Sequence, residues 1–401
     1  MSNADFMAGL RADAEPGSHP GFDSPRVSGQ PDKLLLTGAT GFLGAYLLDE
    51  WLRQTGVTAY CLVRAPDTAA AQARLRLQLD RCGLWSDDRA GRIIAVPGDL
   101  ARPQLGLDAA QYARLAEEID VICHNGAWIN ALLSYQDLKP VNVEGTRAIL
   151  RLAGEVRQKP LHYVSTLALF FGTGHTRQTL TETDVPVLDE GLRGGYKQSK
   201  WVAEQLVRNA GLAGLDTTIY RPGRILGHSH SGVNTNLQDI FCIILKACLK
   251  LGSYPAMDTV IDITPVDYIS RAVVHLASSE SRRTGEVFHL HNPTPVPWNQ
   301  LMEMVRDLGY PLRPLPEEAW HSEVRRRSSA QAGESFFRQL RLLLRSPIYL
   351  FSPDKPLYCG EMTLNRLAEA GIVCPRVDAE LLATYVGYLK DCGFITVDSN
   401  P

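Results

Sequence analysis

The stretch TGATGFLG, at positions 37–44, joins a short apolar run to a segment with helical periodicity. The run KLLL at 33–36 predicts a buried strand, and apolar residues at helical spacing over 42–53 predict the helix that follows. The first glycine permits a tight turn, the second lets the backbone approach a phosphate, and the third lets the helix pack on the strand. The helix N-terminus then faces an anion. We therefore predict a nucleotide-binding turn, with cofactor contacts from Gly38, Thr40, Gly41, Phe42, Leu43 and Gly44.

The composition is that of a large folded protein. Of the 401 residues, 45% are hydrophobic and 21% are charged, and the formal net charge is −3. This charge gives no general attraction to nucleic acid or to an anionic membrane, and no apolar stretch reaches membrane-spanning length. The eight cysteines are scattered without a CxxC pair. That pattern indicates reduced, mostly buried thiols, a cytoplasmic protein and no zinc or other metal site.

Arg64 decides which cofactor we expect. It follows a second predicted strand at 57–63, where an acidic residue would bind the ribose 2′-hydroxyl of NAD and an arginine suits the 2′-phosphate of NADP. No Asp or Glu ends this strand, and Arg74 lies one helical stretch further on as a second contact. The sequence therefore predicts NADPH; the alternative interpretation of Arg64 is a solvated charge at the end of a strand.

Two further strands are predicted, each followed by candidate cofactor residues. A strand at 93–96 precedes a loop containing Asp99 and Leu100, which suits the adenine edge. Another at 121–123 leads into His124, which we interpret as a hydrogen-bonded residue at a strand end and not as a catalyst.

A helix is predicted to open at Asn142, with a buried stripe of Ile149, Leu152 and Val156. The strand predicted at 162–166 then delivers two hydroxyls at its carboxyl end, the edge where parallel sheets bind ligands.

Tyr196 and Lys200 lie four residues apart near the start of a predicted helix, so their side chains share one face. A tyrosine has an ordinary pKa near ~10, and a neighbouring ammonium favours the phenolate and lowers that pKa. The pair therefore predicts a tyrosine that works as a general acid. Thr166 supplies a second hydroxyl, and Ser165 should point to the opposite side of the strand.

The order of the motifs carries a resemblance. TGATGFLG, GDL, HNGA, NVEGT, VST, YKQSK and RPGRILG follow one another as in extended short-chain dehydrogenase/reductases. More narrowly, the chain resembles the NADPH-dependent thioester reductase domains that end many nonribosomal peptide synthetases, polyketide synthases and carboxylic acid reductases. DITPVDYI at 262–269 and LRADA at 10–14 also look like that family, and the resemblance covers about residues 10–292.

The resemblance implies an α/β fold, a doubly wound parallel Rossmann sheet with a smaller, mostly helical C-terminal substrate subdomain. It implies catalytic roles for Thr166, Tyr196 and Lys200. Further cofactor contacts are implied at Asn125, Gly126, Ala127, Pro222 and Ile225. The implied reaction reduces a thioester on the phosphopantetheine of an acyl or peptidyl carrier protein to an aldehyde, or further to an alcohol. The protein would be a monomer or part of a larger synthetase.

The expected domains follow from this resemblance. Residues 1–32 read as a linker from an upstream carrier region, and 33–228 as the NADP-binding domain, with strands from about 258–292 returning to it. Residues 229–257 and 293–401 are expected to form the subdomain that binds substrate and carrier. The apolar helix predicted from Leu237 could line an acyl channel, but core packing is the favoured interpretation. A basic stretch is either a solvated face or a docking site for an acidic carrier; it comprises Arg325–Arg327, Arg338, Arg341 and Arg345.

Three alternatives stay open. A fatty acyl-CoA reductase would use the same chemistry. A nucleotide-sugar epimerase or dehydratase would hold NAD through an acidic residue, against which Arg64 argues. A non-catalytic NADP-binding module typically loses the tyrosine or the lysine, and both are present.

Overall fold

The protein divides into two compact units. The computed structural model describes residues 3–15, 22, 24–27, 29–174, 178–279, 282–329, 335–344 and 355–395. Unit 1 comprises Met1–Gly223, Asp267–Leu290 and Pro356–Val373. Unit 2 comprises Arg224–Val266, His291–Lys355 and Cys374–Pro401.

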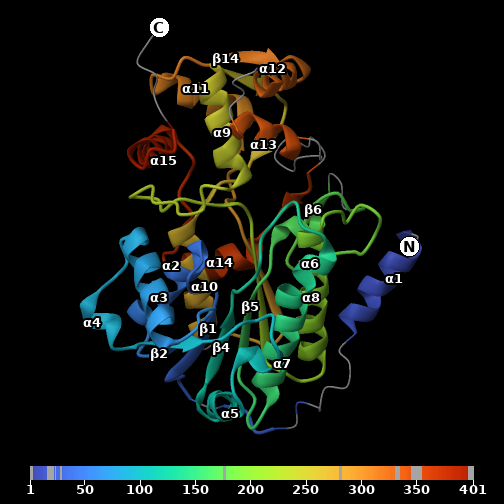
Figure 1. Ribbon diagram of the computed structural model, residues 1–401, viewed down its shortest axis with the longest axis vertical. Helices are drawn as coiled ribbons and strands as arrows, with labels where there is room; N and C mark the ends of the chain where they lie inside the picture. Colours follow the sequence, from blue (N-terminus) through green and yellow to red (C-terminus); the bar gives the residue numbers. More distant parts are fainter. Residues whose placement is uncertain are drawn as a thin grey trace. The chain divides into compact units, whose positions relative to one another are not determined.

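Unit 1 is built on a seven-stranded parallel sheet with the order β12-β7-β5-β4-β1-β2-β3 (Figure 1). The chain runs outward from β1 to β3 and then returns to β4 on the other side of β1. This reversal between β1 and β4 is the switch point at which doubly wound folds bind ligands. The predicted doubly wound parallel fold is confirmed. The strands are β1 Lys33–Thr37, β2 Thr58–Val63, β3 Ile93–Pro97, β4 Val121–His124, β5 Leu161–Val164, β7 Thr217–Pro222 and β12 Glu286–Leu290.

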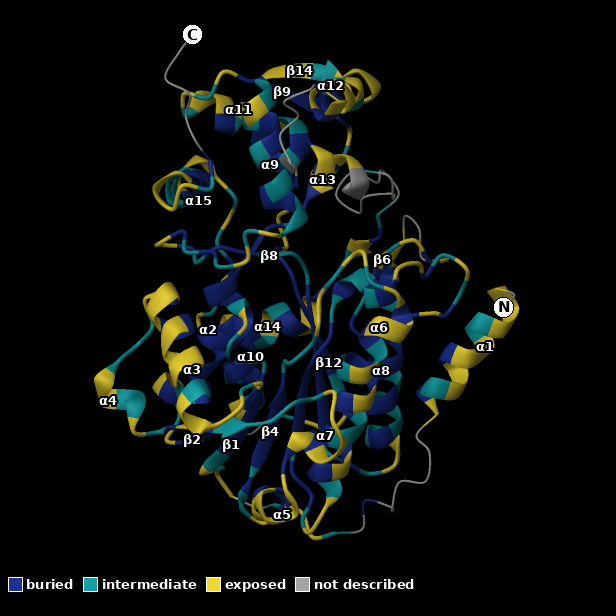
Figure 2. Ribbon diagram, in the orientation of Figure 1, coloured by how far each residue is buried: buried dark blue, intermediate teal, exposed yellow. Residues whose placement is uncertain are grey.

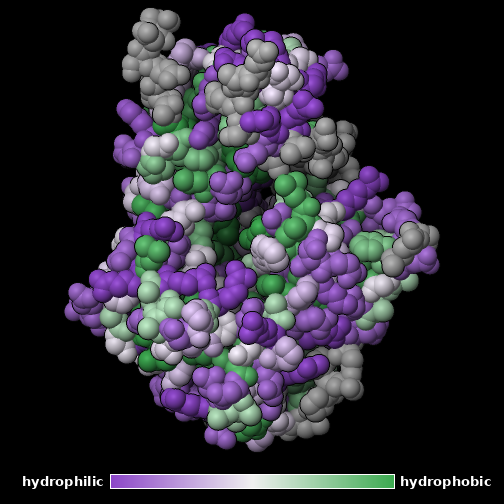
Figure 3. Space-filling model, viewed as in Figure 1, coloured by the Kyte–Doolittle hydropathy of each residue, from purple (hydrophilic) through white to green (hydrophobic). Residues whose placement is uncertain are grey.

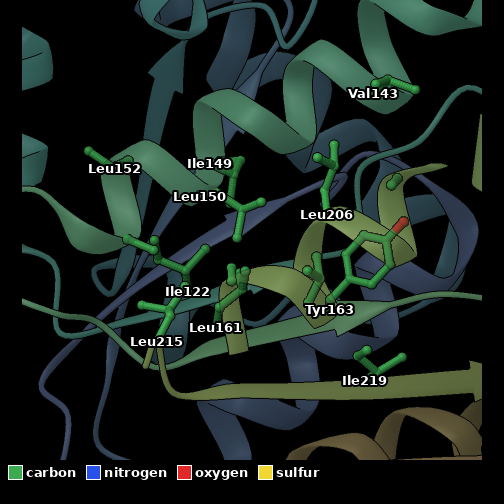
Figure 4. Packing of buried hydrophobic residues seen from close by; sticks show 14 of the residues in the cluster. Ile122, Val143, Ile149, Leu150, Leu152, Leu161, Tyr163, Leu206, Leu215 and Ile219 are labelled. Carbon is green, nitrogen blue, oxygen red and sulfur yellow. The ribbon is translucent and has the colours of Figure 1, made fainter. Parts of the chain in front are cut away.

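Most strand residues are buried because both faces of the sheet are covered. Alternate residues point to opposite faces, and Leu34, Leu35 and Leu36 are all fully buried. Figure 4 shows one face, where strand residues including Ile122 and Leu161 meet helical residues such as Leu150 and Leu206.

The helices of unit 1 pack on the sheet and on each other. α2 and α3 lie over the β1–β3 side, and α7 and α8 pack together against β4 and β7. In Figure 2 many residues of α3 are exposed, α4 is part exposed and part intermediate, and most strand residues are buried. The helices are α1 Asn3–Ala14, α2 Phe42–Gln54, α3 Thr68–Cys82, α4 Asp87–Ala90, η1 Pro103–Gly106, α5 Ala109–Glu118, α6 Tyr135–Lys139, η2 Pro140–Glu144, α7 Gly145–Gly154, η3 Leu167–Phe170, α8 Gly195–Leu212, α10 Val266–Ser278 and α14 Glu361–Glu369.

The helical segment predicted to open at Asn142 begins earlier, at Tyr135. Ser134 and Asp137 form a reciprocal capping box there, with backbone N–H to side-chain distances of 3.0 and 3.3 Å. The chain passes through a π turn at Pro140–Glu144 and continues as α7. The predicted start was therefore wrong by about two turns, because the capping signal lies upstream of the proline.

The predicted buried stripe of α7 is correct at Ile149 and Leu152 but wrong at Val156. The helix ends at Gly154, so Val156 no longer follows its periodicity. Val156 is 57% exposed and has a φ of +64°, a conformation that is strained for a β-branched residue.

The N-terminal residues, expected as a linker, include a helix that belongs to unit 1. Leu10 of α1 is buried in the same cluster as the sheet core. The Asp13 carboxylate accepts hydrogen bonds from the Tyr135 hydroxyl and the Lys139 ammonium, both at 2.6 Å. α1 also packs on α8, where the Asn209 amide donates to the Ala14 carbonyl at 3.1 Å.

Pro356–Val373 also belong to unit 1, although residues 293–401 were all expected in the substrate- and carrier-binding subdomain. β15 (Leu357–Tyr358) pairs with β6 (Thr179–Leu180), and α14 packs on β12. Thr363 anchors the segment, because its hydroxyl and amide both donate to the Glu182 carboxylate, at 2.8 and 3.0 Å.

Unit 2 is mostly helical, with short strands in pairs: β8 with β11, β10 with β13, and β9 with β14. The helix expected from Leu237 begins at Ile240, where the Asp239 side chain accepts from the Phe241 amide at 2.8 Å. Its apolar residues lie in the core of unit 2, so the core-packing interpretation is confirmed. The elements are β8 Ile225–Leu226, α9 Ile240–Leu251, β9 Ser253–Ala256, β10 Val260–Ile261, β11 Thr264–Pro265, β13 Val296–Pro297, α11 Trp298–Asp307, β14 Arg313–Pro316, α12 Glu317–Ser329, α13 Ser335–Leu343 and α15 Ala379–Asp391.

The cysteines are free thiols, and apart from Cys359 and Cys392 they are buried, as expected. In the part of the chain that the structure describes, no helix has the length and apolar character needed to span a bilayer.

Candidate active site

The glycine-rich turn brings β1, the start of α2 and the end of β4 into close contact. Gly38 has a φ of +77°, and a Cβ there would lie 2.9 Å from the Asn125 side chain and the Gly126 backbone. A Cβ on Gly44 would lie 1.9 Å from the Gly38 carbonyl oxygen, so α2 could not approach the turn with any other residue. Gly41 precedes α2 without a side chain to cap it. The backbone N–H groups of the first helical turn therefore point toward the space where a phosphate would sit.

A buried hydrogen-bonded chain links β1, β4 and α7 beside this turn. The Thr37 hydroxyl lies 2.7 Å from Nδ1 of His124 and accepts from the Gly126 amide at 2.9 Å. The other imidazole nitrogen lies 3.1 Å from the Thr146 hydroxyl. Burial, with Lys200 adding to it, lowers the pKa of His124 to about 3, so the ring is neutral. His124 is thus a hydrogen-bonded strand-end residue, as predicted, and its partner Thr37 holds the Gly126 amide of the NGA segment.

Arg64 and Arg74 lie together at the end of β2. Both are exposed, and the Arg74 guanidinium donates to the backbone carbonyl of Arg64. Asp99 and Leu100 follow β3 on the same edge of the sheet; the Asp99 carboxylate accepts from the Ala101 amide at 3.0 Å, and Leu100 packs against the core.

Thr166 and Ser165 leave the end of β5 in different environments. Thr166 is half-buried and caps η3, accepting from the Ala168 amide at 3.1 Å. Ser165 is buried and donates to the Glu204 carboxylate at 2.5 Å, so its hydroxyl is already engaged. The predicted opposition of the two side chains agrees with these partners. Because η3 packs on α8, Thr166 lies beside the helix that carries Tyr196.

Lys200 is held by strand β5. Its ammonium donates to the Tyr163 hydroxyl at 2.6 Å and to the Val164 carbonyl at 2.7 Å. Burial lowers the pKa of Lys200 to about 7, and the Glu204 carboxylate acts in the opposite direction. An ammonium has three N–H donors, so one remains for a further partner after these two.

The Tyr196 phenol differs from the sequence-based expectation. Burial raises its pKa to about 12, whereas the pairing with Lys200 predicted a lowered pKa. The reason is geometric: Lys200 is committed to Tyr163 and Val164, so burial is what decides the pKa of Tyr196. Tyr196 is consequently protonated at neutral pH.

Asn142 was missed as a site residue and joins the two sides of this region. Its side chain accepts from the Trp128 amide at 2.7 Å and donates to the Trp128 carbonyl at 3.1 Å and to the Ser199 hydroxyl at 2.9 Å. Ser199 in turn donates to the Tyr196 carbonyl at 2.8 Å. The NVEGT motif contains Asn142, but only the fold shows which loops it connects.

The comparisons with known proteins decide the family. Residues 36–273 match the NAD-binding family described as "Male sterility protein". The chain belongs to this family. It is 40% identical to the terminal reductase (R) domain of the myxalamid PKS-NRPS biosynthetic pathway, whose crystal structure superposes with a TM-score of 0.92 and matches over 98% of this chain and 99% of that one.

Two curated relatives are much longer proteins. One polypeptide of the linear gramicidin synthase of Brevibacillus parabrevis is 38% identical over 91% of this chain, which spans 7% of the relative's length. Isonitrile lipopeptide synthase from Streptomyces coeruleorubidus is 39% identical over 96% of this chain, which spans 26% of the relative. The protein is therefore an oxidoreductase of the extended short-chain dehydrogenase/reductase superfamily, similar to synthetase terminal reductase domains, with a nicotinamide-cofactor fold.

The remaining predicted residues of this reductase domain are spread over both units. Pro222 ends β7 in unit 1, whereas Ile225 lies on β8 in unit 2. The basic stretch lies on α12 and α13, where hydrophilic side chains gather on the visible surface over α12 (Figure 3). Its arginines at 325–327, 338 and 341 are exposed, and Arg345 lies outside the described residues. Glu323 forms ion pairs with Arg326 at 2.5 Å and Arg327 at 3.9 Å, which offsets part of their charge.

Proposed function

We propose that this domain uses NADPH to reduce the thioester of a carrier-bound acyl or peptidyl chain, releasing it as an aldehyde. The observation that carries the proposal is the arrangement at the end of β5. Thr166 leaves that strand, Lys200 is bonded to the strand residues just before it, and Tyr196 lies one turn before Lys200 on α8. Thr166, Tyr196 and Lys200 thus belong to elements that pack together at the carboxyl edge of the sheet, which supports roles in holding a carbonyl and a ribose.

The residues at the switch point fit a dinucleotide. The closest backbone approach, at Gly38 and Gly44, leaves no room for side chains, and α2 presents uncapped amides to a pyrophosphate. Arg64 and Arg74 form an exposed pair at the end of β2, where a 2′-phosphate would lie. This pair supports NADPH over NADH.

The bound cofactor supplies the hydride. As the thioester carbonyl accepts it, negative charge develops on the carbonyl oxygen, and hydrogen bonds from Thr166 and Tyr196 stabilise that charge. Tyr196, protonated at neutral pH, gives its proton to the oxygen. Collapse of the resulting thiohemiacetal then forms the aldehyde and frees the pantetheine thiol. No cysteine nucleophile is needed, because the thioester is already activated.

The role of Lys200 follows from its remaining N–H. Two of its donors bind Tyr163 and Val164, which aims the ammonium along the strand end. The third is available to a ribose hydroxyl or to the Tyr196 oxygen. In either case the charge on Lys200 favours loss of the proton from Tyr196 during the reaction.

The partner we propose is an acyl or peptidyl carrier protein. The exposed arginines of α12 and α13 offer a cationic surface to an acidic partner, beyond the charge that Glu323 offsets. The alternative interpretation of these arginines, a solvated helix face, predicts no effect of their neutralisation.

A direct assay tests the proposed reaction. An acyl chain loaded on a carrier protein is supplied with NADPH, nicotinamide absorbance is followed, and the product is identified by mass as aldehyde or alcohol. The matching CoA thioester is run in parallel, because a fatty acyl-CoA reductase would prefer it. Absence of NADPH oxidation with every thioester would contradict the proposal, and turnover of a nucleotide sugar would replace it with an epimerase-type activity.

A further inference from the structure

Glu204 is a buried carboxylate that the proposed reaction does not use. It lies on α8 one turn beyond Lys200, so Tyr196, Lys200 and Glu204 follow one another on a single face of the helix. Its side chain has no exposed surface. A buried carboxylate is retained at a cost in desolvation and therefore needs specific partners.

Those partners come from two strands of the sheet. The Ser165 hydroxyl, at the end of β5, donates to one carboxylate oxygen at 2.5 Å. The fully buried Arg221 guanidinium, on β7, donates to the other oxygen at 2.7 Å. Arg221 is itself fixed, because it donates to the Asp184 carbonyl at 2.9 Å and lies 3.1 Å from Nε2 of His289 on β12.

The contacts of α8 with β5 are consecutive along the strand. Lys200 bonds to Tyr163 and Val164, and Glu204 bonds to Ser165, which immediately precedes Thr166. The hydroxyl of Thr166 and the phenol of Tyr196 must meet on one carbonyl oxygen. The position of the Thr166 hydroxyl relative to the Tyr196 phenol is thus set by the neighbouring contact between β5 and α8, the Ser165–Glu204 hydrogen bond.

We propose that Glu204 is a positioning residue: bonded to Ser165 and Arg221, it fixes the Tyr196–Lys200 face of α8 against the strand end that carries Thr166, and its charge, one helical turn from Lys200, favours the ammonium form of that residue. Glu204 touches neither substrate nor cofactor. The inference rests on the proposed reaction, because it concerns the geometry of that site.

The effect of Glu204 on the protonation of Lys200 depends on the other titratable groups around that ammonium. Tyr163 and His124 come from β5 and β4, and Glu204 comes from α8 itself; Tyr196, also on α8, acts on this cluster through Tyr163. Arg221 and Arg208 reach the cluster through Glu204. Glu204 is the carboxylate of this set. Its removal therefore disfavours the ammonium and moves the loss of the Lys200 proton to lower pH.

Ser165→Ala is the primary test, because it removes one hydrogen bond and leaves the Glu204–Arg221 ion pair in place. We expect kcat for the carrier-bound thioester to fall on the order of tenfold, since small misplacements of catalytic groups are costly. The dissociation constant for NADPH and the alkaline limb of the pH–rate profile should stay as in the parent. An unchanged kcat would overturn the positioning role.

Glu204→Gln tests the charge. It should lower kcat and also move the alkaline limb of kcat/KM to lower pH by at least about half a unit, a shift that a purely structural role would not produce. If the alkaline limb of kcat/KM in Glu204→Gln stays at the parental pH, the Glu204 charge does not act on Lys200. Glu204→Asp is the control for the charge, because it keeps the carboxylate and should keep the parental limb. If Glu204→Gln does not fold, Ser165→Ala still decides the positioning role.

The matched control is Asp216→Asn. Asp216 precedes β7 at its opposite end and forms a partly buried ion pair with Arg282, with N–O distances of 2.7 and 2.6 Å. It should lower the melting temperature while leaving kcat and the pH profile unchanged. A parent that fails to reduce any thioester contradicts the proposed function, whereas an active parent with unaffected Ser165→Ala contradicts only this inference.

Discussion

The Lys200 ammonium lies 2.6 Å from the Tyr163 hydroxyl and 4.2 Å from the centre of its ring. Tyr163 is a buried strand residue, so Lys200 is positioned by the sheet and not by the tyrosine one turn before it on α8. Strand β5 therefore prepares the site before cofactor or substrate arrives.

Tyr163→Phe removes that acceptor while keeping the ring. We expect the dissociation constant for NADPH to rise about tenfold, because a hydrogen bond to a charged group contributes roughly 1.5–3 kcal/mol. Titration of NADPH fluorescence measures it. Tyr220→Phe is the control, since its hydroxyl lies 3.0 Å from Nδ1 of His162 in the neighbouring strand. Equal NADPH affinity in Tyr163→Phe and the parent would show that Lys200 finds its position without this bond.

Tyr196→Phe removes the phenol that we propose as the proton donor. Turnover of the carrier-bound thioester should fall on the order of a hundredfold or more, because general acid catalysis is lost. NADPH should bind as in the parent, which a fluorescence titration checks. A variant that reduces the thioester near the parental rate would exclude Tyr196 as the acid.

Arg64→Ala tests cofactor choice. Loss of a charged hydrogen bond to the 2′-phosphate, worth roughly 1.5–3 kcal/mol, should weaken NADPH at least about tenfold and leave NADH nearly unaffected. The control is Arg81→Ala, an exposed arginine further along α3. A parent enzyme with equal affinity for both cofactors would remove the basis for assigning NADPH.

Val156→Gly should stabilise the protein. Val156 is exposed and has a φ of +64°, which costs an L-residue roughly 1–2 kcal/mol, so glycine should raise the free energy of unfolding by about 1 kcal/mol. Urea unfolding measures the change. The control is Val185→Gly, at a valine that is 47% exposed but does not have a positive φ, and it should not stabilise. Stabilisation by both variants, or by neither, would argue against relief of backbone strain.

Much of the sheet could be predicted because its signals are local. Each signal lies within a few residues of the element that it predicts. Examples are the turn at 37–44, the apolar runs that predict strands, and the hydroxyls at 165–166 that mark a strand end. The start at Tyr135 was also local, since Ser134 and Asp137 have capping-box spacing, but the later NVEGT motif drew the predicted helix start to Asn142.

The partners within the site could not be predicted, because they join residues far apart in the chain. Spacing places Tyr196 and Lys200 on one face but does not show that Tyr163 holds the lysine. Ser165 and Glu204 are 39 positions apart, and their contact depends on how β5 and α8 pack. The docking of α1 likewise depends on Tyr135 and Lys139, which the sequence does not connect to Asp13.

The protein attached to the thioester should affect how well the substrate is delivered to the site. A free CoA thioester and a carrier-bound one present the same carbonyl to Thr166 and Tyr196, so only the attached protein distinguishes them. We expect a higher kcat/KM for the carrier-bound substrate than for the matching CoA or pantetheine thioester. This advantage should shrink at high salt, because exposed charges more than about 10 Å apart are screened at 0.1 M.

Replacing Arg325, Arg326 and Arg327 with Gln then tests the docking surface. KM for the carrier substrate should rise about threefold to tenfold at low salt, because three cations are lost and Glu323 is left unpaired. The kcat value and the pantetheine kinetics should not change. The control replaces exposed arginines of unit 1 that also pair within their own helices: Arg53, Arg76 and Arg114. An equal rise in KM with the control would indicate a general charge effect, and no rise in either would move the docking site to residues 229–257.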